Sequence, residues 1–364
     1  MSRQTIAQIN LSAFRHNLRC VRTQAPSAQV LAVVKANAYG HGLMNILPAL
    51  NDADGLALLE LPAGIALRER KYGRRILLLE GFFSPDELKE ISRHRLAVVV
   101  HSHEQIEMLQ QAKLARPLEI FLKINTGMNR LGIPVDKTKQ YAELLTSFPS
   151  VAALRLMTHL GRGESHEGAV DQLAKFEEAC QGLPYPKSIA NSAGILRYNA
   201  VGGEIVRAGL MLYGSSPLPG KPAHTLGLQS VMTLRSELIA VQEVAAGELV
   251  GYGEVYRTTR RSRIGVVACG YADGYPVTAR NGTPVIVAGK RTVLVGRVSM
   301  DMMCVDLTDI PEANPGSPVT LWGEGLPIDE IAHRAGVISY QLMCAVAPRV
   351  RFVTTEVGKV DFEL

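Results

Sequence analysis

Apolar runs of strand length alternate with helical segments through the first two thirds of the chain, and this alternation limits the possible folds. Segments with helical spacing lie between most of the runs, for example Pro62–Tyr72, Asp136–Ser147 and Val170–Gln181. Strands that alternate with helices predict parallel strands joined by helical crossovers. Eight repeats favour an α/β fold, a (β/α)8 TIM-like barrel over residues 10–229, with a doubly wound open sheet as the alternative. The eight runs are Val30–Val34, Leu56–Leu59, Ile76–Leu79, Leu96–Val100, Leu118–Ile124, Val151–Met157, Ser188–Ala190 and Ile205–Leu212.

The pattern changes after residue 230. Segments such as TPVIVAGKRTVLVGRVSMDMMCVDL alternate apolar and polar residues around glycine-containing turns, and long helical patterns are absent until Asp329. Such alternation is typical of antiparallel strands. A chain of 364 residues is long enough for a barrel plus an addition. We therefore expect a β-rich domain over residues 230–364, with residues 1–9 packed against it.

The charge pattern argues against nucleic-acid binding. The formal net charge is +5, but the basic residues are scattered, and the densest run, Arg257–Arg263, has no interleaved aromatic residues. A nucleic-acid surface would favour a basic stripe that carries stacking aromatics. We expect a solvated face here instead.

Apolar segments, cysteines and histidines indicate the cellular location and whether the protein binds a metal. The N-terminus lacks the apolar stretch of a signal peptide, and no apolar run approaches the length of a membrane span. The five cysteines are widely spaced and form no metal-type pair, and His101 and His103 have no third ligand at useful spacing. We expect a reduced, cytoplasmic protein with no metal and no membrane partner.

A lysine stands where the first strand ends, in the stretch VLAVVKANAYGHG. A buried lysine loses solvation of its ammonium group, so its pKa falls and a neutral, nucleophilic amine becomes available. The alternative for Lys35 is an ordinary surface lysine that opens a loop. Chemistry in such barrels gathers at the C-terminal ends of the strands, and several polar residues stand at or near those positions: Lys35, Lys123, Asn125, Arg130, His159, Asn191, Ser192 and Arg207.

The segment AVVKANAYGHG resembles the pyridoxal-phosphate lysine motif of bacterial alanine racemases. The segments KINTGMNRLG, MTHL, NSAG, VRAGLMLYG, VGYGEVY, GYADGYP and VGRVSMDMMCVDL match further motifs of that family in family order. The resemblance covers essentially the whole chain and implies a barrel with an added β domain. It also implies an isomerase that interconverts L-alanine and D-alanine with pyridoxal 5′-phosphate, either for cell-wall peptidoglycan or for catabolism.

The resemblance implies two catalytic residues. Lys35 corresponds to the Schiff-base lysine, which becomes a base on one face of the substrate Cα. Tyr252, in VGYGEVY, corresponds to the second acid/base on the opposite face, although from sequence alone it could be a turn aromatic. Because a tyrosine is normally protonated at neutral pH, nearby cations must favour its phenolate, and the family match assigns that task to His159 and Arg207.

The resemblance also implies binding roles for other residues. Arg207 corresponds to the arginine at the pyridine nitrogen of the cofactor, and Lys123 to a lysine that many relatives carbamylate. Asn125 departs from the family pattern, because many relatives have aspartate there. The implied cofactor-binding residues are Lys35, Tyr39, Arg130, His159, Asn191, Ser192, Arg207, Gly209 and Tyr340, and the implied substrate-binding residues are Arg130, Met300, Asp301 and Tyr271.

The implied partners are alanine and a second copy of the chain, in a homodimer whose β domains complete each other's sites. Two other functions compete with this one. A pyridoxal-phosphate carrier would not need the β domain, Tyr252 or the SMDMMCVDL segment. A pyridoxal-phosphate decarboxylase of the same barrel class would be expected to carry a glycine-run phosphate loop and a CDG-type motif, which are absent. Within racemases, serine or other small amino acids remain alternative substrates.

Overall fold

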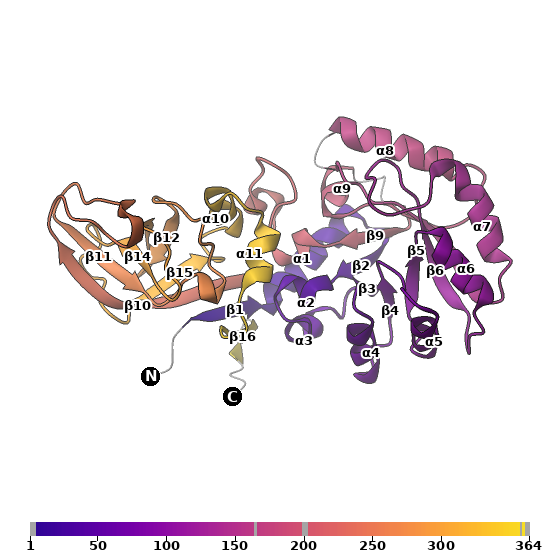
Figure 1. Ribbon diagram of the computed structural model, residues 1–364, viewed down its shortest axis with the longest axis horizontal. Helices are drawn as coiled ribbons and strands as arrows, with labels where there is room; N and C mark the ends of the chain where they lie inside the picture. Colours follow the sequence, from indigo (N-terminus) through magenta and orange to yellow (C-terminus); the bar gives the residue numbers. More distant parts are fainter. Residues whose placement is uncertain (1–4, 164–165, 199–202, 357–358, 361–364) are drawn as a thin grey trace.

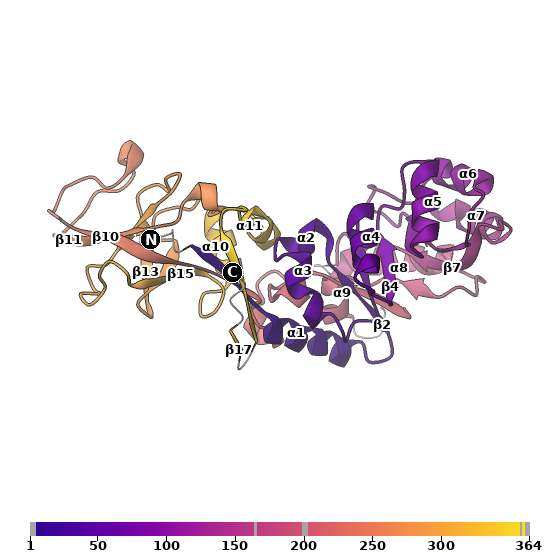
Figure 2. The same cartoon turned by 90° about the horizontal axis from the view of Figure 1, so that it is seen from below.

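The computed structural model describes residues 5–163, 166–198, 203–356 and 359–360. Two lobes lie side by side along the long axis of the molecule, and α10 and α11 lie between them (Figures 1 and 2). One lobe is built from the first part of the chain and the other mostly from the last part. Within the described residues, no helix combines the length and apolar character needed to cross a bilayer.

The first lobe is a closed barrel of eight parallel strands, which confirms the expected fold. Neighbouring strands follow the order β8-β7-β6-β5-β4-β3-β2-β9. The sheet closes between its two edge strands, because the Arg207 amide donates to the Ala190 carbonyl oxygen at 2.9 Å; an open sheet would leave these edges apart. The strands are β2 (Gln29–Val33), β3 (Gly55–Leu58), β4 (Arg75–Leu78), β5 (Ala97–Val100), β6 (Leu118–Lys123), β7 (Val151–Met157), β8 (Lys187–Ser188) and β9 (Ile205–Ala208).

The eighth strand is shorter than expected. It ends at Ala208, because the backbone turns at Gly209 (φ −121°, ψ −101°) into a 3₁₀ turn, η3 (Leu210–Tyr213). Of the barrel helices, α4, α7 and α8 correspond to the segments predicted at Pro62–Tyr72, Asp136–Ser147 and Val170–Gln181, although α8 begins four residues earlier than predicted. They are α1 (Leu11–Gln24), α3 (Leu43–Ile46), α4 (Leu61–Glu69), α5 (Pro85–Arg93), α6 (His103–Gln111), α7 (Thr138–Thr146), α8 (His166–Ala179) and α9 (Ser192–Arg197).

The second lobe is a β-rich domain built around a nine-stranded sheet. Most neighbours are antiparallel as expected, but β1 and β16 run parallel. The N-terminal strand therefore belongs to this sheet, where it also pairs with β10. The strands are β1 (Ile6–Asn10), β10 (Met232–Val244), β11 (Ser262–Val267), β12 (Pro284–Val287), β13 (Lys290–Val295), β14 (Met303–Asp306), β15 (Pro318–Trp322), β16 (Arg351–Glu356) and β17 (Lys359–Val360).

Two short helices, α10 (Ile328–Ala335) and α11 (Ser339–Ala345), connect this sheet to the barrel side. Ser215, which follows η3, donates a hydrogen bond to Asp329 of α10 at 2.5 Å and shares one with Ser339 of α11 at 2.7 Å. These contacts hold α11 beside the open end of the barrel, so Tyr340 can contribute to a site there.

Candidate active site

The C-terminal ends of the barrel strands surround a cavity of about 1190 Å³. It extends outward between the loop after β9 and α10, where Pro217 and His333 line it. Ten of the residues selected from the sequence line this cavity: Lys35, Tyr39, Lys123, Arg130, His159, Asn191, Ser192, Arg207, Gly209 and Tyr340. Elements far apart in the sequence therefore bring these side chains to one end of the barrel.

Lys35 opens a left-handed turn, α2 (Lys35–Tyr39), directly after β2. Four successive residues, 36–39, have φ between 50° and 57°. A left-handed residue other than glycine costs about 1–2 kcal/mol, so the surroundings must hold this turn in place. Buried His41 does so in part, because its Nδ1–H is within hydrogen-bond distance of the carbonyl oxygens of Ala38 (3.1 Å) and Tyr39 (3.0 Å).

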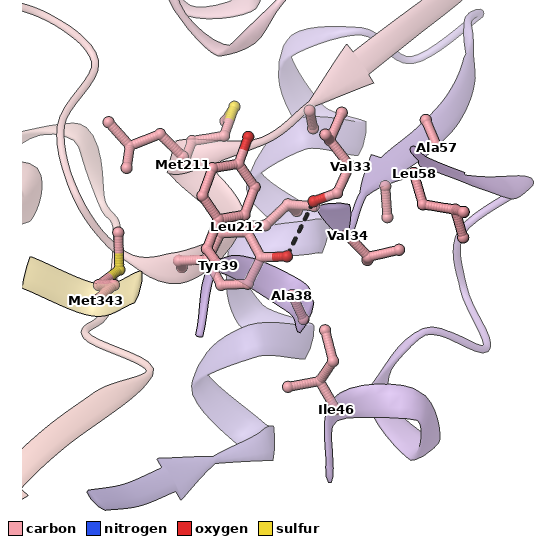
Figure 3. Close-up of a cluster of buried hydrophobic side chains, with 14 of the residues drawn as sticks. Val33, Val34, Ala38, Tyr39, Ile46, Ala57, Leu58, Met211, Leu212 and Met343 are labelled. Carbon is pink, nitrogen blue, oxygen red and sulfur yellow. Dashed lines mark hydrogen bonds between the residues drawn. The ribbon is translucent and has the colours of Figure 1, made fainter. Parts of the chain in front are cut away.

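Apolar packing also supports the turn. Figure 3 shows Ala38 and Tyr39 among the buried side chains of Val33, Met211 and Leu212, with Met343 of α11 at the edge of the cluster. The turn is therefore anchored by strand, loop and helix residues from both lobes.

Gly40 ends this turn where two backbones meet. It has φ +77°, and a Cβ added there would lie 2.1 Å from the Met343 carbonyl oxygen of α11. We expect Gly40→Ala to lower the free energy of unfolding by about 2–4 kcal/mol, because it adds a backbone clash to the cost of a positive φ. Gly182→Ala is the matched control: Gly182 has φ +75° but nothing within 4 Å of the added Cβ. If urea unfolding shows the same loss of unfolding free energy in both variants, the contact with α11 does not contribute to stability.

Cations dominate the inner part of the cavity and shift each other's pKa. Burial, and then Arg130, lower the pKa of Lys35. Burial lowers the pKa of Lys123 to about 8, with Arg207, Arg130 and Lys35 adding to the effect. Both amines therefore lose their protons more easily than exposed lysines do.

His159 is neutral in this environment. Burial first, then the charges of Arg207 and Lys123, lower its pKa to about 3. In the single chain a positive charge on His159 is therefore disfavoured, because it would add to a buried cationic cluster. The expectation that His159 is a cation beside Tyr252 stays a prediction, since Tyr252 does not line this cavity. It can act as a neutral hydrogen-bonding group, and Arg207 supplies the positive charge.

Arg207 is buried and rigidly held. Nη1 donates to Ser188 Oγ at 2.7 Å, and Nη2 donates to the carbonyl oxygens of Thr158 (2.6 Å) and Ile189 (3.2 Å). Among the described residues, no acceptor lies at Nε. A guanidinium has five N–H groups, one of them at Nε. The Nε–H of Arg207 is therefore available to donate to a group bound in the cavity, which Arg207 lines.

Ser192, Gly209 and Tyr39 form a cluster of donors beside the cavity. Ser192 Oγ accepts from the Gly209 amide at 2.9 Å, and a Cβ on Gly209 would lie 2.8 Å from the Tyr39 hydroxyl. The Tyr39 and Tyr340 rings lie 5.5 Å apart, centroid to centroid. Asn191 caps the helix that begins at Ser192, because its Oδ1 accepts from the Gly194 amide. In this chain the Gly209 amide donates to Ser192, and the Tyr39 and Ser192 hydroxyls at the same place are donors that suit an anion.

The loop that carries Arg130 folds back onto the end of β6. The Ile133 amide donates to the Lys123 carbonyl oxygen at 2.9 Å. Asn125 Oδ1 accepts from the amides of Gly127 and Asn129, as an aspartate could, while Asn125 Nδ2 donates to Asn129 Oδ1, which an aspartate could not do. Asparagine at this position therefore keeps the loop turn and adds one bond.

Asn125 and four residues with implied catalytic or substrate-binding roles do not line the cavity of this chain; the four are Tyr252, Tyr271, Met300 and Asp301. These four lie in the β domain, where Tyr252, Tyr271 and Met300 are 72%, 41% and 54% exposed. Asp301 Oδ1 accepts from Arg349 Nη2 at 2.7 Å, and Arg349 also binds Asp273 at 2.7 Å. This pairing fixes the 271–273 segment beside 300–301.

Glu80 lines the cavity although sequence reasoning missed it. It follows the end of β4 by two residues and acts electrostatically on Lys35 and Lys123, favouring their charged forms. A search for polar residues after every predicted strand would have found it. The left-handed turn was also missed, and the small residues Ala36, Asn37 and Ala38 are only a weak signal for it.

Comparisons with known proteins agree along nearly the whole chain. A family model described as "Alanine racemase, N-terminal domain" matches residues 9–217, and one described as "Alanine racemase, C-terminal domain" matches residues 231–354. A relative from Klebsiella aerogenes named "Alanine racemase, catabolic" is 50% identical, over 97% of this chain and 100% of the relative.

Solved structures give the same result. A biosynthetic alanine racemase from Pseudomonas aeruginosa has a TM-score of 0.94 and 44% identity, covering 97% of this chain and 100% of its own. An alanine racemase from Bartonella henselae with covalently bound pyridoxal phosphate has a TM-score of 0.88 and 28% identity over the same shares of the two chains.

Proposed function

The chain belongs to the alanine racemase family of isomerases, and from that premise we propose that it interconverts L-alanine and D-alanine with pyridoxal 5′-phosphate in the barrel cavity and two bases, Lys35 and Tyr252. The observation that carries the proposal is the convergence of Lys35, Arg207 and the Ser192–Gly209–Tyr39 cluster on one cavity. The relatives include a catabolic and a biosynthetic enzyme, so the proposal covers both roles. Optical rotation of L-alanine incubated with the holoenzyme is the direct test.

The residues present fit pyridoxal phosphate. Lys35 offers an amine with a lowered pKa as a covalent anchor. Gly209 leaves room where a Cβ would lie 2.8 Å from the Tyr39 hydroxyl, so a phosphate could approach the donors there. Arg207 keeps Nε as a donor toward a ring nitrogen, and because it cannot give up its proton, it would keep that nitrogen unprotonated.

When bound, pyridoxal phosphate makes the Cα hydrogen of an amino acid acidic by drawing electrons away from Cα. Lys35 Nζ is then the base that removes or returns a proton on one face of Cα. Tyr252 Oη does the same on the opposite face, because one base on one face would tend to return the proton to its original side. Arg130 and the Met300 amide would hold the substrate carboxylate, and a neutral His159 would accept or donate one hydrogen bond near Tyr252.

The second base must reach the cavity from another chain in this proposal. Tyr252, Tyr271 and Met300 lie on what we call the exposed β-domain face, residues 249–255, 271–277 and 299–302. Backbone bonds join the second and third of these segments: the Tyr271 amide donates to the Ser299 carbonyl oxygen at 3.0 Å, and the Ala272 amide to that of Met300 at 2.9 Å. Large exposed apolar side chains gather on it: Leu249, Tyr252, Val255, Tyr271, Val277, Met300 and Met302.

Such a surface is unusual for a monomer and typical of an interface. We propose that it covers the barrel cavity of a second copy in a homodimer. The tyrosines would then narrow the approach to the cavity and favour alanine over serine and over larger amino acids. Comparable turnover of leucine would contradict this size selection.

Lys123 is proposed to carry a carbamate that holds Arg130. In this reaction the neutral amine adds to CO2, forming an N–C bond, and releases one proton. Because the pKa of Lys123 is about 8, its neutral fraction rises as pH rises through that value. At constant dissolved CO2 we therefore expect a carbamate signal in 13C NMR that grows from neutral pH to about pH 9 and is absent in Lys123→Met. A spectrum without this signal in the wild-type holoenzyme would remove the modification from the proposal.

A further inference from the structure

Gln172 of α8 is fully buried, and none of the roles above uses it. Its side-chain Nε2 donates to Thr126 Oγ1 at 3.3 Å and to the His159 carbonyl oxygen at 3.1 Å, and its Oε1 accepts from the Arg162 amide at 3.2 Å. A buried amide without partners costs about 1–3 kcal/mol. Three hydrogen bonds to three separate positions satisfy this one.

Two of these bonds hold the backbone just before a turn and within it. The His159 carbonyl lies two residues before the turn that follows β7, at residues 161–163, and the Arg162 amide lies within that turn. Neither bond uses the imidazole of His159, so the ring stays free to line the cavity. Gln172 itself does not line the cavity and acts on the turn from the side of α8.

The same network extends toward Arg207. Thr126 Oγ1 shares a hydrogen bond with Thr158 Oγ1 at 2.8 Å, and Thr158 Oγ1 donates to the Ile124 carbonyl oxygen at 3.0 Å. The Thr158 carbonyl in turn accepts from Arg207 Nη2 at 2.6 Å. Gln172 and Thr126 therefore hold residues 158 and 159 from the side away from the cavity. Residue 158 contacts Arg207, and residue 159 is the cavity histidine itself.

We propose that Gln172 is a positioning residue of the racemase: it holds the end of β7 and the following turn so that His159 and Arg207 keep their orientation toward the cofactor. This inference rests on the proposed cofactor site and deepens it. A shift of about 1 Å in a group that orients reacting atoms can cost about 100-fold in rate, which a single buried amide can prevent. Gln172 remains neutral throughout and takes no part in proton transfer.

The first test replaces Gln172 with leucine, which has similar volume and no polar group. We expect kcat/KM for alanine to fall about 10–100-fold and the dissociation constant for pyridoxal 5′-phosphate to rise about 10-fold. Gln181→Leu is the control, since Gln181 is exposed just beyond the end of the same helix, and it should change neither. If Gln172→Leu lowers only the melting temperature, with both constants within about two-fold of wild type, Gln172 is merely structural and the proposal is wrong.

A second variant keeps the proposal testable if the leucine variant does not fold. In Gln172→Glu, burial raises the pKa of the new carboxyl group. The protonated acid can still donate to the His159 carbonyl, whereas the carboxylate cannot. The ratio of variant to wild-type kcat/KM should therefore rise as pH falls through that pKa, together with the ratio of cofactor affinities. A constant ratio across the pH range would contradict a positioning role.

A third readout separates this inference from the proposed function. Hydrogen exchange of the Arg162 amide should be faster in Gln172→Leu or Gln172→Glu than in wild type, with or without activity. If wild-type protein fails to racemise alanine, the proposed function is wrong, and this exchange still reports on the turn. If wild type is active but Arg162 exchange and both constants are unchanged in the variants, the inference alone is wrong.

Discussion

Replacing Lys35 with alanine is expected to lower alanine racemisation by about 10³-fold or more while the barrel stays folded. The variant loses both the covalent anchor for the cofactor and the base on one face of Cα. The free energy of unfolding should not fall, because burial already disfavours the charged form of this amine. The rate of D-alanine formation and the urea unfolding curve measure the two effects. Lys139→Ala, on the exposed side of α7, is the control and should leave both unchanged.

Chemical labelling tests the same residue without a substitution. Borohydride should reduce the bond between the cofactor and its lysine, and peptide mapping of the treated holoenzyme should then find the label on Lys35. Lys123 is the informative alternative, because it lines the same cavity and its pKa is also lowered. A label on Lys123, or retained activity in Lys35→Ala, would contradict the proposed anchor.

Mixing two inactive variants should restore activity if the sites are shared. Lys35→Ala and Tyr252→Phe change residues in different lobes, and Tyr252 is 72% exposed and outside the cavity of its own chain. Each variant alone should lose about 10²–10⁴-fold or more. After subunit exchange, half of the dimers are mixed, and each has one site with both bases and one with neither. Recovery should therefore approach about a quarter of wild-type activity.

The control for this experiment uses two changes in the same lobe. Lys35→Ala mixed with Arg207→Ala should restore little, because both residues line one cavity and every mixed dimer would have one defect in each site. A mixture of Lys35→Ala and Tyr252→Phe that stays inactive despite demonstrated subunit exchange would mean that each chain builds its own site. Recovery in the same-lobe control as well would show that the gain does not come from a shared site.

The positions of the barrel strands could be predicted closely from the sequence. The run Val30–Val34 became β2 (Gln29–Val33), and Leu118–Ile124 became β6 (Leu118–Lys123). Strands buried on both faces leave continuous apolar runs, so their pattern is local and readable. The last apolar run of the barrel, which contains β9, did not predict where its strand ends. The strand ends at Ala208 because the backbone turns at Gly209, and the hydrophobic pattern does not encode that turn.

The candidate site could be predicted only in part. Polar residues after strands pointed to Lys35, Lys123, His159 and Arg207, because a parallel barrel brings its strand ends together. The neutral state of His159 could not be predicted, since its pKa of about 3 depends on burial beside cations from other strands. The Gln172 network was also invisible, because a buried glutamine on α8 looks like any polar helical residue until its partners are known.

By itself the sequence determined the alternation of strands and helices, the change to β structure near residue 230, and the polar residues at the strand ends, because periodicity and strand length are local properties. The tertiary structure alone decided the closure of the barrel at Arg207 and Ala190, the left-handed turn after Lys35, and the separation of Tyr252 from the cavity of its own chain. These features depend on contacts between residues far apart in the chain. The strained turn persists only because Gly40, His41 and α11 hold it. The charge of a buried group depends on the residues that the fold places beside it.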